Sequence, residues 1–137
     1  MEARVEYDSS LRFFSGPNEA RIFMDGARDV GGLGVWPSPK QLVLHGLAGC
    51  TGMDVVFMLE KQKIPFSDFS VHVKARQNNS HPRVFKEIRI TYRIRAHEDF
   101  KPKIVRAIEL SEGRFCGVSA MLAKTAKITW ELELLDQ

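Results

Sequence analysis

The sequence has only two cysteines, little net charge and no apolar run in its first residues, and each shortage argues against a class of protein. Its first residues, MEARVEYDSSL, include acids and no apolar run, so we expect no signal peptide. A formal net charge of +3 does not by itself indicate nucleic acid or a membrane surface. The four histidines lack the spacing of a zinc site. We therefore expect no metal and no cofactor.

The length and the cysteine count together predict one cytoplasmic domain. A chain of 137 residues with an ordinary hydrophobic and charged content fits a single globular domain over residues 1–137. Without a secretion signal, a structural disulfide between Cys50 and Cys116 is not favoured. Two alternatives remain for these residues at this point. They are two buried free thiols or a redox pair.

One long apolar stretch, from Trp36 to Lys63, stands out in the chain. Ser38 and Gln41 have the spacing of a capping box, with Pro39 at the first helical position, so a helix begins here. Its residues are apolar on nearly all sides, which is typical of a buried helix. His45, Asp54 and three glycines argue against a membrane span. The glycines recur at every third position (Gly46, Gly49, Gly52) and suggest that another backbone approaches closely, within the subunit or across a dimer.

Alternating and helical patterns around this helix predict an α+β fold rather than βαβ winding. The predicted strands cover residues 3–8, 11–14, 20–24, 69–76, 87–95 and 128–134. The first three form a meander, with a turn at Gly16-Pro17-Asn18 and a glycine-rich loop after it. Two further helices are predicted over residues 101–112, ended by Gly113, and over residues 119–124. The element order is thus β-β-β-α-β-β-α-α-β.

Two cysteine motifs carry a resemblance to a known family. They are SPKQLVLHGLAGCTGMDVV around Cys50 and RAIELSEGRFCGVSAML around Cys116, with the proline-flanked strand HPRVFKEIRITY between them. In this order they resemble the OsmC/Ohr family of organic hydroperoxide reductases, and most closely its OsmC-like branch. The resemblance covers essentially the whole chain.

The resemblance implies a fold, a reaction and partners. The fold would be OsmC-like, with antiparallel sheets packed on a long buried central helix and an intertwined homodimer with active sites at the subunit interface. The reaction would be thiol-dependent reduction of organic hydroperoxides, in defence against oxidative stress. Cys50 would be peroxidatic, Cys116 would resolve its sulfenic acid, and an external dithiol would reduce the disulfide. The alternative is a non-catalytic dimer on the same fold that binds a small hydrophobic ligand at the interface.

What would activate Cys50 is not evident from the local pattern. Cys50 lies about 18 Å along the helix from Ser38, too far for the helix N-terminus to stabilise a thiolate. Cys116 stands at a predicted helix start, so local reasoning favours it as the more acidic thiol. An ionised Asp54, one turn after Cys50, would disfavour a thiolate there.

In the family an arginine from the preceding loop activates the first cysteine, held by a glutamate just after the helix-start proline. Arg28 is the best match to that arginine. Lys40 occupies the glutamate position here, and a lysine cannot hold an arginine as a glutamate does. The resemblance therefore leaves two possibilities: another acid (Asp29, Glu60 or a partner-subunit residue) replaces the glutamate, or the activity is weakened.

A basic strand face offers a third reading, a nucleic-acid-binding module. Its residues are Lys74, Arg76, Arg89, Arg93 and Arg95. Sheet-type RNA binders need exposed aromatics to stack bases, whereas Phe69, Tyr92 and Trp130 fall on the apolar face. We expect a solvated or dimer-covered surface, with no nucleic acid and no membrane as partners.

Overall fold

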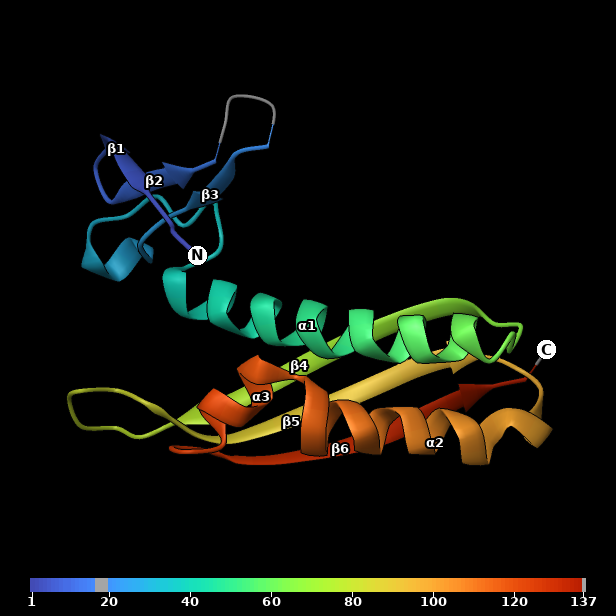
Figure 1. The fold of residues 1–137 in the computed structure, drawn as a ribbon. Coiled ribbons are helices and arrows are strands. Elements are labelled where there is room, and N and C mark those ends of the chain that lie inside the picture. The colour runs from blue at the N-terminus through green and yellow to red at the C-terminus, as the bar shows by residue number, and fades with distance from the viewer. Residues whose placement is uncertain (17–19, 137) are drawn as a thin grey trace. The chain divides into compact units, whose positions relative to one another are not determined.

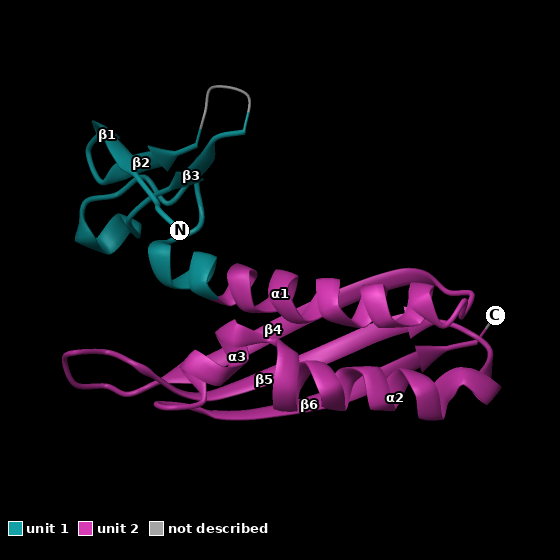
Figure 2. Cartoon of the chain, in the orientation of Figure 1, with its two compact units in different colours: residues 1–43 teal, residues 44–137 magenta. Residues whose placement is uncertain are grey.

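The protein is described by a computed structural model that covers residues 1–16 and 20–136. The chain divides into two compact units, residues 1–43 and residues 44–137 (Figure 2). Pro17 and Asn18 of the predicted turn lie outside the described residues. That residues 1–137 form one domain stays a prediction.

The first unit contains the predicted meander. Its strands are β1 (Val5–Ser9), β2 (Arg12–Ser15) and β3 (Ile22–Met24), which pair antiparallel in that order. The glycine-rich loop after β3 contains a single turn of 3-10 helix, Arg28–Val30. Asp25, 1% exposed, organises this loop by accepting hydrogen bonds from the backbone N–H groups of Leu33 and Val35.

The capping box is present where the sequence predicts it. Helix α1 (Pro39–Lys61) begins after Ser38, whose Oγ accepts from the backbone N–H of Gln41 at 3.3 Å. The Gln41 side chain returns the bond by accepting from the Ser38 N–H at 2.8 Å. Two of the donors that a helix start leaves unpaired are thereby satisfied.

The second unit is built on a three-stranded sheet in the order β4-β5-β6 (Figure 1). Strands β4 (Ser67–Gln77) and β5 (Phe85–Arg95) form the predicted antiparallel hairpin. Strand β6 (Lys127–Leu135), however, pairs parallel with β5, with Ile90 opposite Trp130. The prediction of wholly antiparallel sheets is therefore wrong at this pair, because the helices between β5 and β6 return the chain to the same end of the sheet before β6 begins.

One face of the sheet carries the core of the second unit. The buried side chains of β5 are Ile88, Ile90, Tyr92 and Ile94. They share one cluster with side chains of α1 and of α2 (Lys101–Leu110), namely Leu47, Val55, Leu59, Ile104, Ala107 and Ile108. Both helices therefore cover the same face. The predicted hydrophobic alternation of β5 is confirmed.

The opposite face is exposed but is not uniformly basic. Arg76 pairs with Glu87 at 2.6 Å, and Thr91 donates to Glu131 at 2.8 Å. The parallel register of β6 also places Glu133 opposite Arg93. The predicted basic stripe is thus interleaved with carboxylates, which lowers its attraction for a polyanion.

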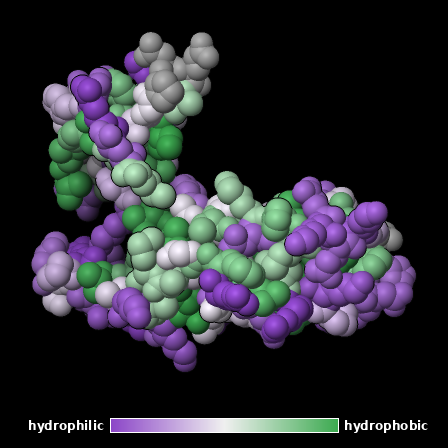
Figure 3. All heavy atoms as spheres, in the orientation of Figure 1, coloured by the Kyte–Doolittle hydropathy of each residue, from purple (hydrophilic) through white to green (hydrophobic). Residues whose placement is uncertain are grey.

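Helix α1 is not buried on all sides in the single chain, contrary to the expectation from its composition. Met53 and Phe57 are 75% and 65% exposed. A Cβ added at Gly46 or Gly49 would meet no atom within 4 Å, so no other backbone among residues 1–16 and 20–136 approaches there. Figure 3 shows hydrophobic side chains gathered along the middle of the second unit, with hydrophilic ones toward both of its ends. By length and composition α1 could cross a membrane, a test that core helices also pass.

The segment after α2 also departs from the prediction. The α-helix does not stop at Gly113 but continues as a π-helical turn, Ser111–Phe115. Cys116 follows in an extended conformation and caps α3 (Gly117–Leu122). A π-turn adds a residue to the helical repeat. It changes the direction in which the next residues face.

Candidate functional site

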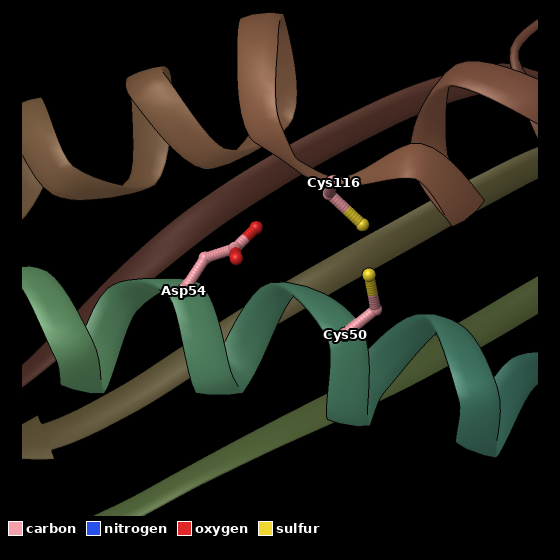
Figure 4. Close-up of side chains that lie close together, drawn as sticks. All are labelled: Cys50, Asp54 and Cys116. Atoms are coloured by element: carbon pink, nitrogen blue, oxygen red, sulfur yellow. The ribbon is translucent and has the colours of Figure 1, made fainter.

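The structure brings the two cysteines together from segments 66 residues apart in the chain. Both are free thiols. Their sulfur atoms and a carboxylate oxygen of Asp54 all lie within 4.8 Å of one another. The two sulfurs point toward each other across the space between α1 and the segment before α3, and Asp54 lies one turn along α1 on the same side (Figure 4). The predicted pair therefore has the proximity that disulfide exchange requires.

The two thiols differ in exposure. Cys50 sits in the middle of α1 and is partly exposed, whereas Cys116 is 2% exposed. The Sγ of Cys116 accepts a hydrogen bond from the backbone N–H of Ser119 at 3.3 Å. A small molecule arriving from solvent would therefore reach the sulfur of Cys50 more readily.

Burial decides the ionisation of the second thiol. Burial raises the pKa of Cys116 above its ordinary value, and the neighbouring sulfur of Cys50 raises it further. Hydrogen bonds from Ser119 act in the opposite direction and do not outweigh burial. The local expectation that Cys116 is the more acidic thiol is not supported, because α3 is a helix of only 6 residues and the thiol that caps it is desolvated.

Behind the thiols, hydroxyl groups form a buried hydrogen-bonded chain. The Oγ of Ser111 donates to Asp54 at 2.9 Å. The Oγ1 of Thr51 lies 2.9 Å from the Ser111 Oγ and 2.5 Å from the hydroxyl of Tyr92. Thr51, Ser111 and Tyr92 are all fully buried. This hydrogen-bonded series of hydroxyl groups therefore runs from α1 to the sheet within the core.

The hydrogen-bonded series of hydroxyl groups ends at a second carboxylate. The hydroxyl of Tyr92 donates to Glu112 at 2.7 Å, and the hydroxyl of Ser119 donates to the other Glu112 oxygen at 3.0 Å. Burial raises the pKa of Tyr92 strongly, and the charge of Glu112 raises it further. Tyr92 therefore keeps its proton, and Glu112 ties the chain to the helix that follows Cys116.

Sequence reasoning did not identify this polar chain, although most of its members lie in the two cysteine motifs. Thr51 follows Cys50 directly, and Ser111, Glu112 and Ser119 flank Cys116. A run of small hydroxyl residues inside apolar helices was the available signal. Their partners are set by packing across the core, and Tyr92 had been assigned only to the apolar face.

The residues that the family pattern connects with activation of the first cysteine are Arg28 and, in the glutamate position, Lys40. Arg28 is exposed in the first unit, where its Nε donates to the backbone oxygen of Leu33 at 3.0 Å. Lys40 is exposed in the first turn of α1. A role of Arg28 toward Cys50 stays a prediction.

The two sulfurs and Asp54 also form a donor set that a thiophilic cation could use. Two thiolates and one carboxylate match zinc chemistry, and ligating carboxylates are commonly held by a second hydrogen bond, as Ser111 holds Asp54 here. The same closeness of the sulfurs suits disulfide formation. The donor set therefore does not by itself separate the two chemistries.

Comparison with known proteins places this geometry in context. The sequence model of OsmC-like proteins matches residues 32–131. Protein YhfA of Escherichia coli (strain K12) is 30% identical over 136 residues, which cover 98% of both chains. A solved structure of a hypothetical protein from Aquifex aeolicus VF5 is 28% identical, with a TM-score of 0.77 over 98% of this chain and 96% of that one. An organic hydroperoxide resistance protein from Elizabethkingia anophelis shares the fold at 14% identity, with a TM-score of 0.73 over 97% and 94% of the chains.

Proposed function

Because the chain belongs to the family of OsmC-like proteins, we propose that it is a thiol-dependent peroxidase that reduces organic hydroperoxides with Cys50 and Cys116. A redox or peroxidase-like role fits the family, and a structural neighbour is an organic hydroperoxide resistance protein. The observation that carries the proposal is the closeness of two free thiols within 4.8 Å, set in the two family motifs.

The reaction requires two steps at sulfur. The thiolate of Cys50 attacks the terminal oxygen of the hydroperoxide, so that an S–O bond forms, the O–O bond breaks and the alcohol leaves after gaining a proton. The thiolate of Cys116 then attacks the sulfur of the Cys50 sulfenic acid, forming a disulfide and releasing water. An external dithiol reduces the disulfide. In sum, one hydroperoxide and two thiols yield one alcohol, one water and one disulfide.

The environments of the two thiols support this division of roles. Cys50 is the more exposed of the two cysteine residues, which supports its role as the one that meets the peroxide. Cys116 is buried, and its raised pKa keeps it protonated and unreactive toward peroxide until a sulfenic acid forms beside it. A buried resolving thiol close to the first sulfur also limits over-oxidation of Cys50.

The exposed side of α1 supports the homodimer that the resemblance implies. Met53 and Phe57 present a large apolar area there, and Gly46 and Gly49 leave room for a second backbone. We propose that this side packs against the partner subunit. The cytoplasm suits a pair of thiols that must be returned to the reduced state after each turnover.

A second candidate function is non-catalytic binding of a small hydrophobic ligand. An apolar groove of about 570 Å³ lies along α1, lined by Met53, Phe57, Phe69 and Val71 among others. Lys40, in place of the family glutamate, favours this reading. It predicts that peroxide leaves both thiols reduced.

One experiment separates the two functions. Reduced protein is treated with cumene hydroperoxide and its disulfides are mapped by mass spectrometry. The peroxidase proposal predicts a rapid Cys50–Cys116 bond that Cys50→Ser abolishes, whereas Cys116→Ser should accumulate sulfenic acid on Cys50. Two free thiols after a stoichiometric excess of peroxide would rule the proposal out.

A further inference from the structure

The buried hydroxyl chain joins two carboxylates through consecutive short contacts. From Asp54 the contacts run to Ser111 at 2.9 Å, to Thr51 at 2.9 Å, to Tyr92 at 2.5 Å and to Glu112 at 2.7 Å. We call the three hydroxyls of Ser111, Thr51 and Tyr92 the relay. All three residues are 0% exposed, so solvent does not complete their hydrogen bonding.

The relay has one hydrogen too few when both carboxylates are ionised. Each hydroxyl carries a single hydrogen. That of Ser111 goes to Asp54, and that of Tyr92 goes to Glu112. The hydrogen of Thr51 can serve only one of its two contacts, so the other would set two lone pairs against each other.

One added proton gives every contact a hydrogen. With the proton on Asp54, the hydroxyls all donate toward Glu112; with the proton on Glu112, they all donate toward Asp54. Moving each of the four protons along its hydrogen bond to the next oxygen converts one arrangement into the other. Neither carboxylate forms an ion pair within residues 1–16 and 20–136. Buried polar groups without partners are costly, so the relay has a physical demand for the proton.

We propose that Asp54, backed by the relay and Glu112, takes the proton of the Cys50 thiol and returns it to the departing alcohol. This inference rests on the proposed attack by Cys50. A carboxylate oxygen of Asp54 lies within 4.8 Å of the Cys50 sulfur. Loss of the thiol proton leaves a thiolate; attack forms the S–O bond and breaks the O–O bond; the alkoxide then takes the proton and leaves as the alcohol.

The proposal resolves the difficulty that Asp54 poses in the sequence. An ionised carboxylate one turn from Cys50 would oppose a thiolate, whereas a carboxylate that has received the thiol proton is neutral. The helix N-terminus is too distant to help. Placing the base on the same helix face as Cys50 therefore supplies a route to the thiolate that depends on neither Arg28 nor Lys40.

The test measures the reactivity of Cys50 alone, in a Cys116→Ser background. The rate of alkylation by iodoacetamide between pH 5 and 10 reports the thiolate of Cys50 without any peroxide. The titratable groups near Asp54 in the parent chain are Cys50 and Cys116, and Tyr92 and Glu112 are joined to it only through the relay, so the background removes one competing thiol.

Cutting the relay is the decisive change. Thr51→Val keeps the shape of the side chain but leaves two separate pairs, Ser111 with Asp54 and Tyr92 with Glu112, each with all its hydrogens. We expect alkylation at pH 7 to slow at least about tenfold, and Thr51→Ser, which keeps the hydroxyl, to react like the background. Equal rates and equal pH profiles for the valine and serine variants would overturn the proposal.

Two further measurements keep the result decisive. If Thr51→Val does not fold by circular dichroism, Asp54→Asn tests the same proton transfer at a partly exposed position and should also slow alkylation; an unchanged rate there would count against the proposal. The peroxide reaction is then followed in single turnover. Slower alkylation with no peroxide reaction in any variant would uphold proton transfer and defeat the peroxidase function. If Asp54→Asn leaves alkylation unaffected and the peroxide reaction is normal, the peroxidase function is upheld and proton transfer to Asp54 is defeated.

Discussion

Oxidation of the cysteine pair should make the protein markedly more stable. A Cys50–Cys116 disulfide closes a loop of 66 residues, and the chain-entropy relation gives about 4 kcal/mol of stabilisation for a loop of that size. The sulfurs already lie within 4.8 Å, so they must approach by less than about 3 Å to reach bonding distance. The hydrogen bond from Ser119 to the Cys116 sulfur is weakened on closing, at a cost of about 1 kcal/mol. The expected net gain is about 3 kcal/mol.

Urea denaturation of the reduced and the oxidised protein measures this gain. Free energies of unfolding should be compared rather than midpoints, because a cross-linked unfolded chain exposes less surface and lowers the slope. The same gain corresponds to a rise in melting temperature on the order of 10 °C. Cys50→Ser, carried through the same peroxide treatment, is the matched control and should show no change.

A stability gain below about 1 kcal/mol would refute the reasoning, because the entropic estimate could then be offset only by strain in the folded state. Such strain would mean that the π-turn and α1 hold the two sulfurs apart and must deform during each cycle. The proximity in the reduced protein would then not be a preformed arrangement for resolution.

Three more outcomes follow from the structure. Since burial raises the pKa of Cys116 above its ordinary value, and only its thiolate attacks, disulfide formation after a single turnover should accelerate about tenfold per pH unit from pH 7 to 9; a flat rate in stopped flow would show that the thiolate is already present. Ser38→Ala should lower the free energy of unfolding by about 1 kcal/mol, with Ser38→Thr losing less, by urea titration; equal stability of both variants would assign no role to the cap. Lys40→Glu should raise the rate of Cys50 oxidation several-fold if Lys40 weakens an arginine clamp, and an unchanged rate would remove Lys40 from the mechanism.

Local patterns determined most of the secondary structure because their causes are local. The capping box fixes the start of α1 by bonds between Ser38 and Gln41, three residues apart. The alternation of Ile88 and Ile90 with charged neighbours fixes which face of β5 is buried. The direction of β6 has no such local cause. It depends on where the crossover helices return the chain, so parallel pairing was not predicted.

The composition of α1 correctly predicts a helix, but its prediction of burial does not say whether the subunit itself or a partner covers each face. Burial depends on what lies beside each face, and the single chain covers only the side that carries Leu47, Val55 and Leu59. The sequence records the apolar character of Met53 and Phe57 but does not say what contacts them.

The sequence by itself identified the thiol pair that we propose to be reactive, because two cysteine motifs in order are enough to indicate such a pair. Only the tertiary structure decided the state of those groups. Burial of Cys116 reverses the expectation from its helix-start position. The contacts of Thr51 with Tyr92 and Ser111 join residues 41 and 60 positions apart, and no local pattern encodes such pairs. Ionisation depends on solvation and on hydrogen-bond partners, and both are properties of the packed core rather than of any single segment.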